Sequence, residues 1–239
     1  MNKLSIIIPV FCEENTILEI LNRLNKLQLI NDIEKEIIII DDASTDNSQK
    51  IVKEYIKNNP ALPIQYSINK KNRGKGFSVQ KGISLAGGSY LTIQDADLEY
   101  NPEDFNRMLL LLEKNVADVV YGSRFVSSSP HRILFFWHYL GNKLLTTISN
   151  IFTNLNLTDM ETCYKMFTLG TIKNIELKED RFGFEPEITA KIAKIPKIRI
   201  YEVGISYYGR TYQEGKKINW QDGFWALICI LKYNLFYND

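Results

Sequence analysis

Cysteine is scarce in this sequence, and no cysteine-rich motif is present. Cys12, Cys163 and Cys229 are odd in number and scattered along 239 residues. That spacing fits neither a disulfide framework nor a structural zinc site, and it suits a reducing compartment. Long apolar runs are lacking too, because no stretch reaches the roughly 18 residues of a membrane-spanning helix. The N-terminal run 4–10 is too short for a secretory signal, so we expect a cytoplasmic protein.

An excess of charge of one sign is also missing. The 29 basic and 28 acidic residues leave a net charge of +1, so the overall charge predicts no nucleic-acid partner. Two phosphate-binding motifs are absent: G-x-G-x-x-G after the first predicted strand, and G-x-x-x-x-G-K-[ST] anywhere. Their absence argues against a dinucleotide oxidoreductase and against a P-loop enzyme.

Short apolar runs alternate with segments of helical spacing along the chain. Isoleucine-rich runs with little alternation are typical of strands buried on both faces of a parallel sheet. We predict strands at 4–10, 36–41, 64–68, 90–93 and 118–125, one or two more at 197–208, and helices at 185–194 and 219–237. Repeated β-α-β order predicts an α/β fold with a Rossmann-like, mostly parallel sheet flanked by helices and a C-terminal amphipathic helix. With no linker or repeat, residues 1–239 form one predicted domain.

Polar residues follow the predicted strands, where open parallel sheets bind their ligands. Acids, hydroxyls and a basic glycine loop occupy the segments 9–14, 41–46, 69–76, 94–99 and 122–124. In the third segment, Gly74 and Lys75 give a weak phosphate signal, since glycine lets amides approach an anion at a helix start and lysine adds charge. We therefore expect the functional site at this edge of the sheet.

The segment 95–99 carries acids at alternate positions: Asp95, Asp97 and Glu99. Side chains two residues apart on an extended segment point the same way, so Asp95 and Asp97 can face a common point. Mg²⁺ or Mn²⁺ is commonly held by one or two protein carboxylates, with water and substrate phosphates in its remaining positions. This pair therefore predicts a metal–diphosphate site, while Glu99 is either a third ligand or a solvated carboxylate near a helix start.

These motifs resemble those of family 2 glycosyltransferases with the GT-A fold. More closely, they are similar to the dolichyl-phosphate mannosyltransferase branch, which moves a sugar from a nucleotide to a polyprenyl phosphate. The resemblance rests on the segments 5–15, 38–48, 72–76, 95–104, 121–125, 158–167, 182–194 and 202–223. It implies a nucleotide-sugar-binding half at 1–125, an acceptor-binding half at 126–239, and a GDP-mannose or UDP-sugar donor, with no residue deciding between the two bases.

The resemblance also implies roles for individual residues. Asp95 and Asp97 would hold the metal, joined by Glu99 at a position where relatives often carry glutamine. The nucleotide-sugar would contact Pro9, Val10, Phe11, Glu13, Asp41, Asp42, Gly74, Lys75, Asp95 and Ala96.

Arginines complete the expected machinery. Arg210 matches the family's arginine near the diphosphate, whose developing charge needs cations. Arg124 and Arg132 match the positions used for the acceptor phosphate, Arg132 less securely because the 127–130 loop can shift the register. A phosphate monoester is largely a dianion at neutral pH, so it needs steering rather than a general base. The predicted catalytic set is Asp95, Asp97, Arg124 and Arg210.

Alternatives remain open at this point. With a sugar hydroxyl as acceptor, Asp159 or Glu161 is a candidate base, although structural hydrogen bonding is an equal interpretation. A sugar-nucleotide pyrophosphorylase normally shows a G-x-G-T-R-like loop, which is absent. A non-catalytic nucleotide or lipid-phosphate binding module would bind metal and donor without turnover, and the intact Asp95/Asp97 pair argues against it. Glu185 and Glu187 are interpreted as helix caps.

Contact with a membrane is a further open question. The apolar segments 133–152 and 224–237 either face a lipid chain or bilayer surface, or pack on the sheet as core. Lys216 and Lys217 either meet phosphates or headgroups or lie in a solvated turn, and neither His131 nor His138 is expected to be catalytic. The expected location is therefore cytoplasmic, with peripheral attachment to the cytoplasmic face of a membrane, through a partner protein or by adsorption, as the alternative.

Overall fold

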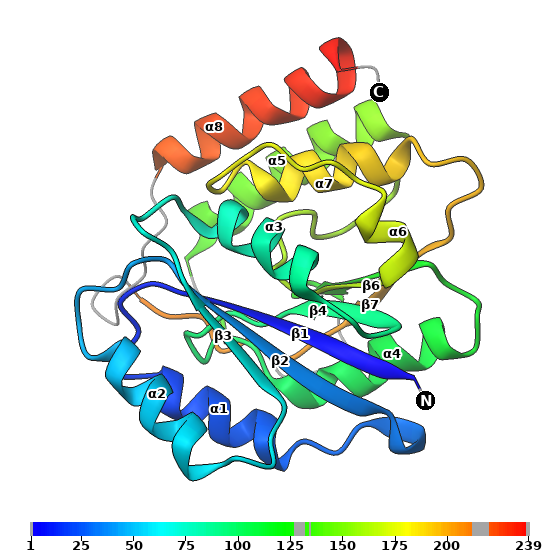
Figure 1. Ribbon diagram of the computed structural model, residues 1–239. Coiled ribbons are helices and arrows are strands. Elements are labelled where there is room, and N and C mark those ends of the chain that lie inside the picture. Colours follow the sequence, from blue (N-terminus) through cyan, green and yellow to red (C-terminus); the bar gives the residue numbers. More distant parts are fainter. Residues whose placement is uncertain (1, 127–131, 134, 212–219, 238–239) are drawn as a thin grey trace.

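The computed structural model describes residues 2–126, 132–133, 135–211 and 220–237, which form a central sheet covered by helices on both faces (Figure 1). Within these residues the sheet has seven strands in the order β3-β2-β1-β4-β6-β5-β7. The strands are β1 (Lys3–Val10), β2 (Glu34–Asp41), β3 (Ile64–Ile68), β4 (Tyr90–Ile93), β5 (Val119–Ser123), β6 (Lys165–Thr168) and β7 (Ile200–Gly204).

Strand β6 runs against the direction of the rest of the sheet. It pairs antiparallel with β4 and with β5, whereas the other described pairs are parallel. Lys165 lies opposite Tyr121 near the end of β5, and the Gly122 amide donates to the Tyr164 carbonyl at 2.7 Å. The chain therefore leaves the sheet after β5 and re-enters it at the same edge.

Helices lie on both faces of this sheet. In Figure 1, α1, α2 and α4 lie below the sheet, α3, α6 and α7 above it, and α5 and α8 pack with α7. The helices are α1 (Ile17–Lys26), α2 (Ser48–Asn58), α3 (Lys75–Leu85), α4 (Phe105–Glu113), α5 (Phe136–Thr153), α6 (Leu169–Lys173), α7 (Phe184–Ala193) and α8 (Trp220–Leu231), with short turns η1 (Ile30–Asp32) and η2 (Pro102–Asp104) and a π-helical continuation η3 (Lys232–Phe236).

The predicted parallel architecture is confirmed. Ile6, Ile7, Ile8 and the isoleucines at 37–40 are fully inaccessible, as expected where helices cover both faces of a parallel sheet. The region 197–208 supplies one named strand, β7, rather than two. Strand β6 and helix α6 have no counterpart among the predicted elements, because each is only four or five residues long.

Gly76 in the first turn of α3 fixes the segment 179–181 against that helix. A Cβ at Gly76 would lie 2.1 Å from the Glu179 carbonyl oxygen, and the Phe77 amide donates to the Asp180 carbonyl at 2.9 Å. We expect Gly76→Ala to lower the free energy of unfolding in denaturant by about 1–3 kcal/mol through overpacking. Gly141→Ala in α5 is the control: a Cβ there meets nothing within 4 Å, so a gain of about 0.5–1 kcal/mol is expected. Equal stability of the two variants would contradict this packing.

Candidate active site

The loops after β1, β2 and β4 each contain a non-glycine residue in the left-handed region. Cys12, Ala43 and Leu98 have φ angles of 53°, 61° and 66°. Such residues cost of order 1 kcal/mol each and cluster at functional sites, where the surrounding structure holds them. Here the Cys12 amide donates to the Ser44 hydroxyl at 3.0 Å, which ties the first loop to the second. The expected site edge is therefore a connected set of constrained turns.

Asp41 and Asp42 end β2 and have different environments. Asp41 is fully buried; its Oδ1 accepts the Ser44 amide at 2.7 Å, while its Oδ2 is buried without a hydrogen-bond partner. Asp42 accepts the amides of Arg73 at 3.0 Å and Gly74 at 2.6 Å. Asp42 therefore supports the β3–α3 loop, whereas Asp41 keeps one oxygen unpaired inside the protein.

One part of the phosphate prediction at Gly74 and Lys75 is wrong: amides at this helix start bond to the protein itself and do not face an anionic ligand. The Arg73 and Gly74 amides donate to Asp42, and the Phe77 amide donates to Asp180, so these amides are already used inside the protein. Gly74 is required instead by its φ of 106° and by close packing on Asp180 and Arg181. The Lys75 ammonium lies 2.8 Å from Asp95, which brings this loop to the acidic segment.

The residues expected to hold the base and ribose differ in what they can offer. Val10 and Ala96 are buried, so only their main chains can reach a ligand, whereas the Phe11 ring is 39% exposed at the loop surface. Glu13 accepts the Thr16 hydroxyl at 3.0 Å, and its carboxylate lies 3.9 Å from the Arg210 guanidinium. Pro9 directly precedes Val10 in β1.

Asp97 lies close to two other carboxylates, those of Asp95 and Glu99, and to the guanidinium of Arg210. Its carboxylate accepts an Arg210 Nη2 hydrogen bond at 2.9 Å. Burial, followed by the charges of Asp95 and Glu99, raises the pKa of Asp97 to about 7 against the opposing effect of Arg210. A divalent cation would relieve this accumulation of charge, and carboxylate oxygens are the ligands that Mg²⁺ and Mn²⁺ prefer. The donor set of Asp95 and Asp97 therefore fits the expected metal.

Glu99 is committed to other contacts. It accepts the Tyr207 hydroxyl at 2.8 Å and the Arg210 amide at 2.8 Å. Across the described ranges, no three His, Cys, Asp or Glu side chains are grouped so that they could hold a metal ion. The three-carboxylate set expected from the sequence is not formed there, and Asp95 with Asp97 stays the predicted ligand pair. Glu99 instead positions the segment that carries Arg210.

Arg124 is held rigidly beside the sheet edge. Its Nε and Nη2 each donate to one carboxylate oxygen of the fully buried Asp159, at 2.7 Å in both cases. Asn142 of α5 also donates to Asp159, at 3.2 Å, and the Arg124 guanidinium lies 5.2 Å from the Tyr207 ring centroid. Asp159 therefore orients an arginine, which favours the structural interpretation of this residue over that of a base.

Tyr207 links Arg124 to Glu99, which binds Arg210, and this tyrosine was not predicted from the sequence. Its hydroxyl binds Glu99, its ring faces Arg124, and its carbonyl accepts the Arg132 amide at 2.8 Å. The Arg132 guanidinium in turn donates to the Gly209 carbonyl at 3.1 Å. Arg124 and Arg132 therefore both contact the segment 207–210, which itself carries Arg210.

Glu185 and Glu187 were wrongly interpreted as helix caps. Glu185 is buried, ion-paired with Lys165 and 3.7 Å from Lys75, so it continues a charge chain from Asp95 into the core. Glu187 accepts the amides of residues 178 and 179 at 2.8 and 2.7 Å and pairs with Lys191. These partners could not be predicted from the sequence, because they lie on separate segments.

Glu161 is a half-buried residue next to this charge chain, and its Oε1 is buried. Its Oε1 has no hydrogen-bond partner, and burial together with the charge of Glu185 raises its pKa to about 7, against Lys165 and Arg124. His138 lies on α5 beside the Phe135 ring, at 5.5 Å between ring centroids. His131, Lys216 and Lys217 fall outside the described residues.

At the sheet edge, Asp95 is thus ion-paired with Lys75 and Asp97 with Arg210. The profile described as Glycosyl transferase family 2 matches residues 5–174, and the chain belongs to this family. The expected fold and enzyme class are thereby confirmed.

Curated relatives confirm the resemblance to the polyprenyl-phosphate branch. The chain is 31% identical over 233 residues to a dolichyl-phosphate beta-glucosyltransferase of Dictyostelium discoideum, covering 90% of this chain and 68% of that protein. It is 25% identical to a dodecaprenyl-phosphate galacturonate synthase of Rhizobium johnstonii, covering 90% and 61%. A dolichol-phosphate mannosyltransferase of Pyrococcus furiosus is 26% identical, with 90% and 60% covered. The chain thus spans about two thirds or less of these relatives.

Solved structures share the fold. Glucosyl-3-phosphoglycerate synthase from Mycobacterium tuberculosis, in complex with Mn²⁺, uridine diphosphate and phosphoglyceric acid, superposes with a TM-score of 0.73. The match covers 100% of this chain and 80% of that one at 13% identity, which shows the fold alone. Among the described helices, none has the length and apolar character needed to cross a bilayer.

Proposed function

We propose that the protein is an inverting, metal-dependent glycosyltransferase that moves a hexose from GDP-mannose or a UDP-sugar to a polyprenyl phosphate. The observation that carries this proposal is the placement of two arginines by one tyrosine. Tyr207 bonds Glu99, which accepts the Arg210 amide, and the Tyr207 ring lies under Arg124. One arginine thus lies at the carboxylate pair and the other beside it, as needed for two phosphate-bearing substrates. The names of the curated relatives support a polyprenyl phosphate acceptor.

Each phosphate meets a different set of residues in this proposal. Asp95 and Asp97 would hold Mg²⁺ or Mn²⁺, which supplies positive charge to the departing nucleotide diphosphate. Arg210 already bonds Asp97 and adds a second cation on the leaving-group side. Arg124, fixed by Asp159, steers the acceptor phosphate, which needs no base because it is already largely dianionic. Displacement from the opposite side of the sugar inverts the anomeric carbon.

The apolar face of α5 and α8 supports a lipid acceptor at a membrane surface. Of the two alternatives for these segments, exposure favours contact with lipid, because large apolar side chains on both helices are not covered by the fold. Trp137 is 76% exposed and Phe224 is 61% exposed. Further exposed apolar side chains are Phe136, Leu140, Leu144 and Ile151 on α5, Trp225 on α8 and Phe236 on η3. We therefore propose peripheral attachment to the cytoplasmic face of a membrane.

Radiolabelled donors mixed with polyprenyl phosphate in detergent test this function. Label from one of the GDP- or UDP-sugars is expected to become extractable into organic solvent when Mg²⁺ or Mn²⁺ is present and to stay in water when the metal is chelated. A thermal-shift panel of nucleoside diphosphates with Mn²⁺ identifies the base, since a ligand that binds only the native state raises its stability. Absence of lipid-soluble label with every common donor would contradict the proposal.

Glu161 favours a second candidate function, transfer to a sugar hydroxyl. A hydroxyl acceptor needs a general base, and a carboxyl whose pKa is near 7 suits that task. The same labelled donors, offered with soluble saccharide acceptors, distinguish the two functions. Water-soluble labelled product in place of lipid product would favour this second candidate.

A further inference from the structure

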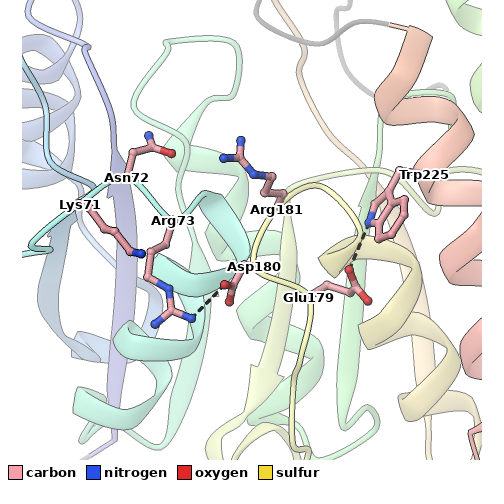
Figure 2. Close-up of a pocket in the computed structure, with 7 residues that line it drawn as sticks. All are labelled: Lys71, Asn72, Arg73, Glu179, Asp180, Arg181 and Trp225. Atoms are coloured by element: carbon pink, nitrogen blue, oxygen red, sulfur yellow. Dashed lines mark hydrogen bonds and ion pairs between the residues drawn. The ribbon is translucent and has the colours of Figure 1, made fainter.

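A concave region of about 520 Å³ lies beside the start of α8, between the β3–α3 loop and the segment before α7 (Figure 2). Three basic side chains line it, Lys71, Arg73 and Arg181, together with the carboxylates of Glu179 and Asp180 and the ring of Trp225. We call this region the α8 pocket. The carboxylate pair and arginines of the candidate active site are not among its lining residues.

Both carboxylates of the α8 pocket are already neutralised by the protein. Asp180 accepts an Arg73 hydrogen bond at 2.9 Å. Glu179 accepts the indole N–H of Trp225 at 3.1 Å, and it also binds Lys232 at 2.7 Å and the Tyr233 hydroxyl at 2.8 Å.

The charges of Lys71 and Arg181 are not balanced in the same way. Within the residues that the structure describes, neither side chain has a hydrogen bond or an ion pair. Two exposed positive charges without a protein partner among the described residues thus border one hollow, where an anion can be attracted to both.

The backbone that carries these cations is firmly held. Asp42 accepts the amides of Arg73 and Gly74, and the Arg73 guanidinium carbon lies 3.5 Å from the Phe77 ring centroid. The side-chain stem of Arg181 packs so closely over Gly74 that a Cβ there would lie 2.7 Å from its Cγ. The backbone of the β3–α3 loop and the stem of Arg181 are therefore held in place before any ligand binds, which lowers the conformational entropy lost on binding.

We propose that the α8 pocket binds a phosphate group, carried by the headgroup of an anionic phospholipid. A guanidinium and an ammonium suit the oxygens of a phosphate. The lipid source is favoured because Trp225 in the pocket wall is 45% exposed, and its neighbour Phe224 is one of the exposed residues of the apolar face of α5 and α8. Tryptophan at a membrane interface places its ring at headgroup level. This binding does not depend on the proposed transfer reaction.

Sedimentation with vesicles tests the α8 pocket. The full chain is mixed with vesicles of phosphatidylcholine alone or of equal parts phosphatidylcholine and phosphatidylglycerol, without donor or metal. The double variant Lys71→Gln/Arg181→Gln is expected to bind the anionic vesicles roughly ten- to thirtyfold more weakly, since each basic residue near such a surface contributes of order a few-fold to tenfold. The matched control is Lys53→Gln/Lys57→Gln on α2, two exposed lysines distant from α8 in Figure 1, and it should bind like the unchanged protein.

The outcomes separate the pocket from general charge and from other anions. Unchanged vesicle binding by the double variant, or an equal loss of binding in the control, would refute the proposal that the α8 pocket binds the lipid headgroup. Millimolar inorganic phosphate that displaces the protein from vesicles more strongly than chloride of equal ionic strength would assign the site to a free anion and overturn the lipid source. Transfer in detergent is a separate readout: a raised KM for the donor in the double variant would assign the pocket to the donor site instead. Failure of the transfer assay leaves the vesicle result standing.

Discussion

Asp97→Asn is expected to lower the rate of sugar transfer by roughly 100- to 1000-fold while leaving the fold intact. The substitution removes a charge that balances Arg210 and that would hold the metal on the donor diphosphate. Because Asp97 lies after a strand end rather than in the apolar core, thermal unfolding should change little. Initial rates at saturating Mn²⁺ measure the effect.

Asp118→Asn provides a matched control for this variant. Asp118 also pairs with an arginine, Arg199, at 2.7 Å, but it immediately precedes β5 and so lies at the opposite end of that strand from Arg124. Transfer by this control should stay within a few-fold of the unchanged protein. An Asp97→Asn variant that is as active as the control would remove Asp97 from the metal site.

The raised pKa of Asp97 adds a pH dependence to the same prediction. The pKa is about 7 in the folded chain and about 4 in the unfolded chain, so between these values the folded chain keeps a proton that the unfolded chain has released. Without metal, stability therefore falls as pH rises through this window and is level above it. Mn²⁺ needs the carboxylate, so its affinity should rise up to about tenfold per pH unit until about pH 7. Affinity measured by titration should lose this dependence in Asp97→Asn.

Arg124→Lys is the second large effect, and it should fall on the acceptor. Lysine offers a point charge where arginine offers a planar fork, so the bidentate grip on Asp159 is lost and the phosphate is no longer steered. We expect the KM for polyprenyl phosphate to rise roughly 10- to 100-fold with little change in the KM for the donor. Arg199→Lys is the control, because Arg199 makes a similar two-point contact with Asp118. A change confined to the donor KM would refute the assignment.

Arg124→Ala is less informative about binding, because it also affects stability. Asp159 is fully inaccessible to solvent, and removal of its arginine would leave a buried charge compensated only by Asn142 and amides. Breaking a buried pair in this way costs about 3–5 kcal/mol. Unfolding in denaturant should separate this loss from the loss of acceptor binding, since Arg124→Ala/Asp159→Asn should recover part of the stability.

The positions of the residues proposed to bind the donor were predictable because they follow one simple rule. In a parallel sheet every strand delivers its next residue to the same edge, so alternating apolar runs located Asp41, Asp42, Asp95 and Asp97 together. Their environments were not predictable. The pairing of Lys75 with Asp95 joins residues 20 positions apart, and only the folded chain shows that Asp42 has its oxygens occupied.

The positions of the residues proposed to bind the acceptor were harder to predict, because β6 runs antiparallel to its neighbours. An antiparallel strand starts at the edge where its neighbours end, so the residues before it, including Asp159 and Glu161, approach the site rather than those after it. Its four residues begin with a fully buried lysine, which no strand pattern would suggest. Lys165 is accommodated because Glu185, from a helix 20 residues onward, neutralises it.

Because β6 pairs with β5, residues 124–164 form one long excursion that leaves and re-enters the sheet between neighbouring strands. The excursion begins and ends beside the contact between Gly122 and Tyr164, so its two ends are neighbours in space. Lengthening a segment with adjacent ends costs little loop entropy, but the last part of this one, including Met160 and Tyr164, is fully buried and belongs to the core. Arg124, Arg132 and Asp159 lie within the excursion, whereas Asp95 and Asp97 lie outside it. Under the proposed function, the exposed part of the excursion can therefore change in length, and acceptor preference with it, while the loops proposed to bind the donor keep their own sequence.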